Sequence, residues 1–286
     1  MKVIYKILYS LFLSAVFLSC SSDDNDVEVI NHSQDEISGL VKIQELTDEN
    51  YEVSLYTKTG KLITGYNEIY LQLKNKKTEK FESGASLSWH PVMHMTSKSH
   101  SCPAGSIEKV PEKQTWYKGF ILFQMAGSES EYWKLTLDYG IKGQNAQISG
   151  NLNVSQSLKR TLQGFTGTDN SRYVVTLVEP SHPDVGTNDL TAYLYKMQDM
   201  NTFVPVDGYT IKFDPRMPGM GNHSSPNNVD LTYTGTSGFY KGKVNLTMTG
   251  YWKINLIVLD DKGQVIKGET ITETNKSSSI YWELEF

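Results

Sequence analysis

Hydrophobic and polar residues alternate along most of this chain in short runs rich in Val, Ile, Tyr, Thr and Leu. The segments YEVSLY at 51–56 and IYLQL at 69–73 are typical. Side chains that alternate with a period of two lie on opposite faces of a strand, so the pattern indicates half-buried β-strands. Turns rich in Gly, Asn, Asp and Lys separate the runs, and no segment carries a long helical stripe. The pattern predicts an all-β fold, most simply a β-sandwich.

An internal repeat divides this region into two similar units. Tyr-Lys-Gly at 117–119 recurs at 240–242, and Tyr-Trp-Lys-Leu at 132–135 corresponds to Tyr-Trp-Lys-Ile at 251–254. Self-similarity at a fixed spacing is the sequence signature of duplicated structural units. Together with a length of 286 residues, the repeat predicts two tandem domains.

We place the first domain at 41–158 and the second at 159–286, with the join near 153–164. A join this short suggests that the two domains are held near each other. Trp133 and Trp252 occupy equivalent positions and open apolar strands, so we expect each to anchor the core of its own domain.

The first twenty residues have the features of an export signal. Lys2 and Lys6 precede an apolar run at 7–18, and Cys20 follows a small residue. The run is too short to span a bilayer as a helix but suits a secretion signal. The segment resembles a bacterial lipoprotein lipobox, which implies that residues 1–19 are a signal peptide and that Cys20 is acylated. The alternative is an ordinary signal peptide with an incidental cysteine.

Residues 20–40 are predicted to be the acylated cysteine and a flexible acidic tether. The run Ser-Ser-Asp-Asp-Asn-Asp at 21–26 looks like the surface-export signal of Bacteroidetes-type lipoproteins, although an acidic linker also keeps a domain solvated. We therefore expect an outer-membrane lipoprotein, attached through its lipid anchor and facing either the periplasm or the cell surface. With Cys20 acylated, Cys102 would be the single free thiol.

Charge and motifs argue against two broad classes of function. The chain has 27 Lys and Arg against 32 Asp and Glu, so it lacks the basic surface that neutralises phosphates, and we expect no nucleic-acid partner. It contains no Gly-x-Ser-x-Gly elbow, His-Glu-x-x-His sequence or phosphate-binding glycine loop. We therefore expect a protein that is not an enzyme.

Two loops at equivalent positions of the repeat concentrate methionine and histidine. Thioether and imidazole donors suit a soft ion such as Cu(I), which binds them in preference to harder ions. The sequence therefore predicts copper binding, with Cu(I) as the expected oxidation state. The predicted ligands are Met93, His94, Met95, His100 and Cys102 in the first loop, and Met217, Met220 and His223 in the second.

Strand alternation suggests which of the first-loop donors converge. In an extended chain, Met93 and Met95 point to one side with His100, and His94 points to the other. Cys102 could be a further ligand, because a thiolate binds Cu(I) tightly, or it could be a small buried residue, which is the more usual fate of a free cysteine.

The second loop allows two interpretations. The Pro218-Gly219 pair favours a tight turn that could bring the sulfurs of Met217 and Met220 toward one centre. Alternatively, these methionines fill the end of the sandwich as adaptable apolar residues. The repeat also leaves open a single metal site shared between the domains.

Methionines outside the loops receive weaker assignments. Met125 and Met248 occupy equivalent repeat positions and could supply extra thioether ligands, but a core role is favoured. Met197 and Met200 are expected to be turn or packing residues.

The second half resembles the FixH/YtkA-like domain family. The resemblance rests on Tyr173, on Gly186-x-Asn188, on Met-Pro-x-Met-Gly-x-His at 217–223 and on Gly-Tyr-Trp-Lys-Ile at 250–254. It covers most of the second half, and the first half is similar only by way of the repeat. It implies that the domains are tandem immunoglobulin-like β-sandwiches of an exported or membrane-anchored bacterial protein.

The resemblance also implies a role, because members of this family are associated with copper handling and cytochrome oxidase assembly. The expected partner is then a copper donor, or an efflux or oxidase-assembly protein, and the expected role is copper trafficking, sensing or detoxification. The rival hypothesis is a structural or interaction lipoprotein that presents loops to a protein or a glycan. The aromatic pairs Trp116-Tyr117 and Phe239-Tyr240 are the candidate surface for that rival.

Overall fold

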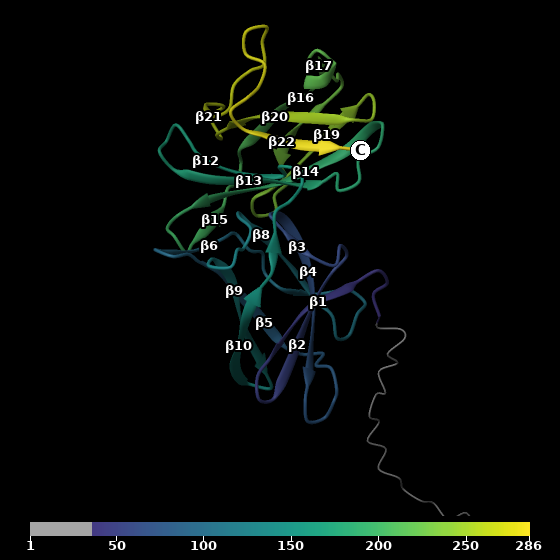
Figure 1. The fold of residues 1–286 in the computed structure, drawn as a ribbon, viewed down its shortest axis with the longest axis vertical. Coiled ribbons are helices and arrows are strands. Elements are labelled where there is room, and N and C mark those ends of the chain that lie inside the picture. Colours follow the sequence, from purple (N-terminus) through teal and green to yellow (C-terminus); the bar gives the residue numbers. More distant parts are fainter. Residues whose placement is uncertain (1–35) are drawn as a thin grey trace, which may run out of the picture.

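The computed structural model describes residues 36–286, and these residues form strands apart from loops and one short 3₁₀ helix (Figure 1). The all-β prediction is confirmed. The predicted signal peptide, Cys20 and the tether up to residue 35 lie outside the described residues. Within 36–286, no helix is long and apolar enough to cross a membrane.

The first domain consists of two packed sheets, with strand orders β1-β2-β4-β8-β7 and β10-β9-β5-β6, and a short parallel pair, β3 and β11. Strands β2, β4, β8 and β7 follow the order A-B-E-D of an immunoglobulin domain, and β5, β9 and β10 follow C-F-G. The bounds are β1 Val41–Thr47, β2 Tyr51–Thr57, β3 Leu62–Ile63, β4 Gly65–Asn75, β5 Ser86–His94, β6 Ser99–Ser101, β7 Glu108–Lys109, β8 Tyr117–Phe123, β9 Tyr132–Ile141, β10 Gln144–Leu152 and β11 Val154–Ser155.

The second domain repeats this order as β12-β13-β14-β19-β18 and β17-β16-β20-β22. Strand β18 pairs with both β19 and β16, which joins the two layers along one edge. The immunoglobulin-like prediction is therefore confirmed by strand order. The bounds are β12 Leu162–Thr166, β13 Arg172–Glu179, β14 Gly186–Met197, β15 Phe203–Pro205, β16 Thr210–Met217, 3₁₀ helix Pro218–Met220, β17 His223–Ser224, β18 Val229–Tyr233, β19 Phe239–Leu246, β20 Tyr251–Leu259, β21 Val265–Lys267 and β22 Tyr281–Glu285.

Each core is anchored by its repeated tryptophan, as the sequence predicts. Trp133 on β9 and Trp252 on β20 are fully buried in separate hydrophobic clusters. Their indole N–H groups donate to the backbone carbonyls of Met125 and Met248, at 2.9 and 3.0 Å. Burial of one such ring contributes roughly 4–6 kcal/mol as an upper estimate from its area.

A repeated hydrogen-bonded turn fixes the start of β4 and of β14, which are the B strands of the two domains. Asn67 on β4 donates to the carbonyls of Ile63 and Gly65, and its side-chain oxygen accepts from the Ile63 N–H. Asn188 on β14 makes the same three bonds to Asp184 and Gly186. The two glycines have φ values of 113° and 112°, which a side chain would strain. The repeated Gly-x-Asn sequence is thus explained by this turn.

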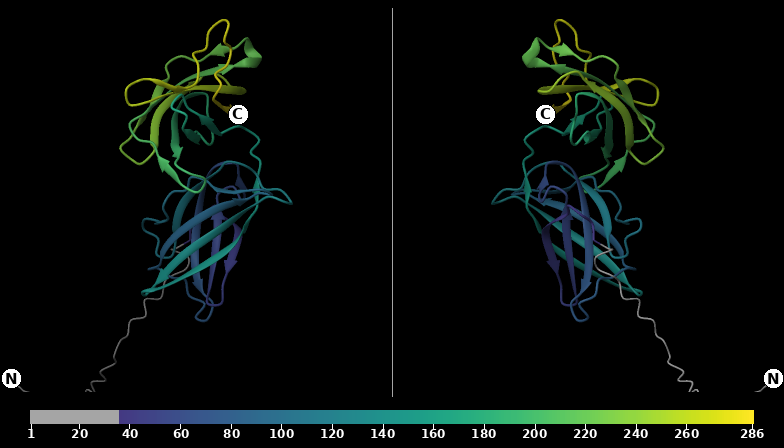
Figure 2. Two further views of the ribbon diagram at one scale, coloured as in Figure 1. Left: turned by 90° about the vertical axis from the view of Figure 1, so that its left-hand side faces the viewer. Right: turned by 90° about the vertical axis from the view of Figure 1, so that its right-hand side faces the viewer.

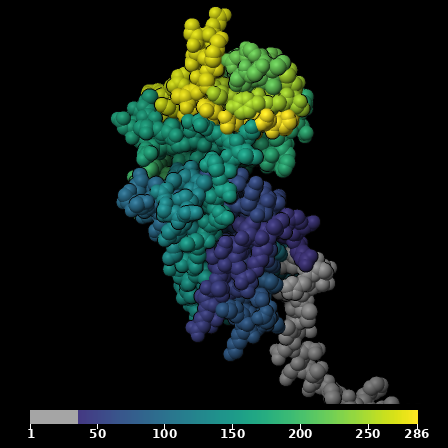
Figure 3. All heavy atoms as spheres, viewed as in Figure 1, coloured from purple at the N-terminus to yellow at the C-terminus, as the bar shows by residue number. Residues whose placement is uncertain are grey.

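The two sandwiches lie end to end along the long axis of the molecule (Figures 2 and 3). Tyr193 on β14 connects them, because its ring stacks on Phe120 of the first domain at 4.4 Å and lies 4.8 Å from Phe239 of its own domain. A backbone hydrogen bond of 2.9 Å from Ser101 N–H to the Met200 carbonyl adds a second contact. Two contacts at different points of the junction restrict rotation of one domain against the other.

We expect Asn67→Ala to lower the free energy of unfolding by about 1–3 kcal/mol, because it leaves buried backbone groups without partners. Asn188→Ala should cost less, since Asn188 is only half-buried and water can replace its bonds. Urea denaturation gives the two losses, and hydrogen-exchange mass spectrometry locates each one in its own domain. Equal losses in the two variants would contradict this account of the turn.

Candidate metal site

The first Met/His loop is the hairpin between β5 and β6, and strand alternation sorts its donors as expected. Met93 and His100 are register partners on one face, and His94 points to the other face, where its ring stacks on Tyr132 at 5.2 Å. However, Met93 is fully buried in the first core. The hairpin therefore presents Met95 and His100, with Met93 enclosed beneath them.

Cys102 lies in the same core as Met93 and is 4% exposed. Burial raises the pKa of its thiol well above the usual value, so the group stays protonated near neutral pH. A protonated, enclosed thiol packs as a small apolar residue and is a poor ligand. Of the two roles that the sequence leaves open for Cys102, the structure favours the buried one.

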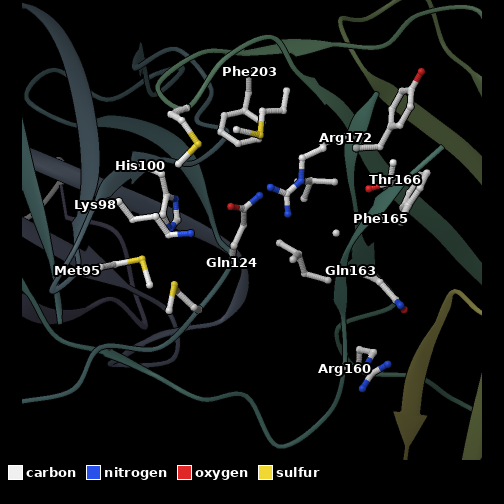
Figure 4. Close-up of a pocket in the computed structure, with 17 residues that line it drawn as sticks. Met95, Lys98, His100, Gln124, Arg160, Gln163, Phe165, Thr166, Arg172 and Phe203 are labelled. Atoms are coloured by element: carbon white, nitrogen blue, oxygen red, sulfur yellow. The ribbon is translucent and has the colours of Figure 1, made fainter. Parts of the chain in front are cut away.

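Met95 and His100 line a cavity of about 570 Å³ at the junction of the two domains (Figure 4). Three further methionines line the same cavity: Met125 from the first domain, and Met197 and Met200 from the second. The cavity thus gathers four thioethers and one imidazole from both domains. A single site shared between the domains, which the repeat leaves open, would have to lie at such a junction.

The His100 ring is held by two contacts. Its Nδ1 lies 2.8 Å from the Ser101 carbonyl oxygen, and its edge meets the Trp133 ring at a centroid distance of 5.7 Å. A carbonyl oxygen only accepts, so Nδ1 carries the proton in this hydrogen bond. In the neutral ring, Nε2 then keeps its lone pair. Histidines that bind metals are commonly oriented in this way, by a backbone carbonyl on the other nitrogen.

Met200 is brought to this histidine by backbone contacts. It lies in the turn between β14 and β15, and its carbonyl accepts from the N–H of Ser101, the residue after His100. Met200 is 38% exposed and lines the cavity. The sequence predicts only turn or packing roles for Met197 and Met200, because no local pattern shows that this turn reaches the first domain.

The charges around the cavity restrict which ion could bind. Lys98, Arg160 and Arg172 are among the lining residues, and no Asp or Glu is. Within 36–286, no three His, Cys, Asp or Glu side chains lie close enough together to hold a metal ion. A metal at this junction would therefore need thioether ligands, which favour a soft monovalent ion over hard divalent ions.

The second Met/His loop is arranged differently. Met217 is 5% exposed in the second core, where its methyl group packs against Gly250. Met220 in the 3₁₀ helix is 59% exposed, and His223 is also exposed. Since Met217 is enclosed, only Met220 and His223 of the three predicted ligands are accessible at this loop. Met217 therefore fits the second interpretation of this loop, in which a methionine fills the end of the sandwich.

An ion pair explains the shape of this second loop. Arg216 donates two hydrogen bonds of 2.7 Å to the Asp214 carboxylate and a third, of 3.3 Å, to the Asn222 carbonyl. These bonds join the strand before the 3₁₀ helix to Asn222, two residues after the helix. This ion pair thus helps to fix the loop around the 3₁₀ helix.

The aromatic surface proposed for the rival hypothesis is largely packed inside the molecule. Trp116, Tyr117 and Tyr240 are buried, and the Tyr240 hydroxyl donates to the Val206 carbonyl at 2.8 Å. Phe239 is half-buried against Tyr193 at the junction. These rings therefore support the fold and leave little aromatic area for a partner.

One family model matches part of the second domain. Residues 169–256 match the model of the YtkA-like family, which confirms the resemblance inferred from the sequence for this part of the second domain. No curated protein sequence matches the chain.

Two solved structures show distant similarity. The FdeC adhesin of Escherichia coli is 16% identical, with a TM-score of 0.25, over 78% of this chain and 64% of that chain. Titin immunoglobulin tandem domains A164-A165 are 13% identical, with a TM-score of 0.17, over 78% and 94%. The chain thus spans under two thirds of the adhesin structure. Both TM-scores are low, so the immunoglobulin-like assignment rests on the strand order described above.

We expect the Cys102 thiol to be unreactive toward a chromogenic disulfide reagent in the folded protein, because it is enclosed and its pKa is raised. The measurement uses a chain that begins at Ser21, in which Cys102 is the single thiol. Reaction should follow urea unfolding, which also serves as the control for total thiol. Rapid reaction in buffer without urea would show that Cys102 is accessible as a ligand.

Proposed function

We propose that this protein is an exported, lipid-anchored copper-binding protein that holds Cu(I) at the junction of its two immunoglobulin-like domains. The proposed ligands are His100 Nε2 and the thioethers of Met95 and Met200, with Met125 and Met197 as further donors in the same cavity. The copper is cargo, and no catalytic step is required. The role would be copper trafficking, sensing or detoxification.

The observation that carries this proposal is the convergence of soft donors from both domains. Four of the chain's nine methionines line one cavity, together with a histidine whose Nδ1 is engaged by a backbone carbonyl. Neutral thioethers bind Cu(I) well and hold hard ions poorly. The neighbouring cations add selectivity, because they repel a divalent ion more strongly than a monovalent one.

A site between domains also suits release of the ion. Ligands that come from two domains separate when the domains move apart, whereas ligands on a single hairpin do not. A partner that binds one domain could thus lower the affinity for the ion. The expected partner is a copper donor, or an efflux or oxidase-assembly protein at the same membrane.

The test is a competition titration of the purified protein with Cu(I) and a chromophoric chelator. We expect one tight site per chain. Met95→Leu/Met200→Leu should weaken it at least about tenfold, as should His100→Gln. Leucine keeps the volume and apolar character of methionine, so the substitution removes the sulfur with little effect on packing.

The matched control is Met220→Leu/His223→Gln, which alters the accessible donors of the second loop in the same way. We expect this control to bind Cu(I) with unchanged affinity. If the control weakens binding and the junction variants do not, the copper site lies at the second loop. No competition by any form of the protein would reject copper binding and favour the rival hypothesis of an interaction or structural lipoprotein.

A further inference from the structure

The junction cavity is electrostatically unlike the rest of the molecule. The chain carries 32 acidic and 27 basic side chains, yet the 17 residues that line the cavity include three cations and no acid. A concave region lined by one sign of charge raises the local concentration of ligands of the opposite sign. The cavity is therefore suited to an anion.

Two of the three cations lack a compensating charge. No ion pair within 36–286 joins Lys98 or Arg172 to an acid. Arg160 differs, because its guanidinium lies over the Tyr281 ring at 4.5 Å and its charge acts on the nearby Glu283 carboxylate. Lys98 and Arg172 are thus the free cations of the cavity, one from each domain.

These two cations and an amide face a common space. Figure 4 shows the Arg172 side chain extending into the cavity toward Gln124, with Lys98 beside His100. Arg172 is the first residue of β13 and the register partner of Met197. Its guanidinium presents a planar fork of N–H donors, which matches the two oxygens of a carboxylate. Gln124 can add a neutral N–H donor.

Much of the remaining lining is apolar and adaptable, although Gln163, Thr166 and Tyr173 add polar groups. Besides the four methionines, Leu162, Phe165 and Phe203 line the cavity. Methionine side chains are flexible and polarisable and adjust to ligands of different shape. A volume of about 570 Å³ lies within the range of small-molecule sites. This lining favours an anion with an apolar body over a fully hydrated inorganic anion.

We propose that the junction cavity binds a small organic carboxylate. The carboxylate is held by Arg172, with Lys98 and Gln124 as further donors, and the apolar body packs against Phe203 and the methionines. This site rests on the charges and lining of the cavity and not on the proposed copper. The two ligands use different atoms, so each can be tested without the other.

The test is a titration of metal-free protein, labelled with ¹³C in the methionine methyl groups, with hexanoate. We expect saturable shifts of the Met197 and Met200 methyl signals, while the distant Met220 signal stays unchanged. Arg172→Gln should weaken hexanoate binding about tenfold through loss of a charged hydrogen bond. Lys98→Gln should weaken it by a smaller factor, because a flexible ammonium pairs less specifically.

Two controls separate the charge from the apolar contact. Hexanamide has the same apolar body without the charge and should give no saturable shift. Lys212→Gln removes an exposed cation of β16 that does not line the cavity, and it should leave binding unchanged. Unmoved signals of the buried Met93 and Met217 would show that each variant is folded. Equal binding of hexanamide, unchanged binding by Arg172→Gln, or shifts confined to Met220 would each overturn the proposal.

Discussion

The Tyr193 ring packs against Phe120 of the first domain and Phe239 of the second, and this stack determines where the two sandwiches meet. Each core encloses one of its own methionines, Met93 or Met217. The first domain brings Met95, His100 and Met125 to the junction cavity, where Met197 and Met200 of the second domain join them. Aromatic packing at the junction brings the β14–β15 turn against the β5–β6 hairpin. The chemistry proposed for the molecule therefore depends on a contact between its domains.

Repetition in the sequence predicts the fold well because the repeated residues have structural roles. The indole N–H groups of Trp133 and Trp252 donate to backbone carbonyls eight and four residues earlier, respectively. Asn67 and Asn188 close equivalent turns in the two domains. Strand alternation also predicts that His94 points away from its neighbours. Such short-range rules act within one strand or one turn, so the local sequence contains the information that they need.

The candidate site was only partly predictable for the same reason. Met95 and His100 stand out because they lie in a dense local cluster of Met and His. Met125, Met197 and Met200 carry no such signal, since their approach depends on how two domains pack. Conversely, Met217 lies in a segment whose sequence resembles a metal-binding loop, but its side chain packs in the second core. Residue type indicates what a side chain can bind, whereas tertiary packing decides whether its donor atom is accessible.

The most direct test of a copper site at the junction is a crystal structure of the Cu(I)-loaded protein, with anomalous diffraction recorded at the copper absorption edge. The proposed function predicts a single anomalous peak between His100 Nε2 and the sulfurs of Met95 and Met200. A peak beside Met220 and His223, or no peak in a crystal of the intact chain grown with Cu(I), would contradict it.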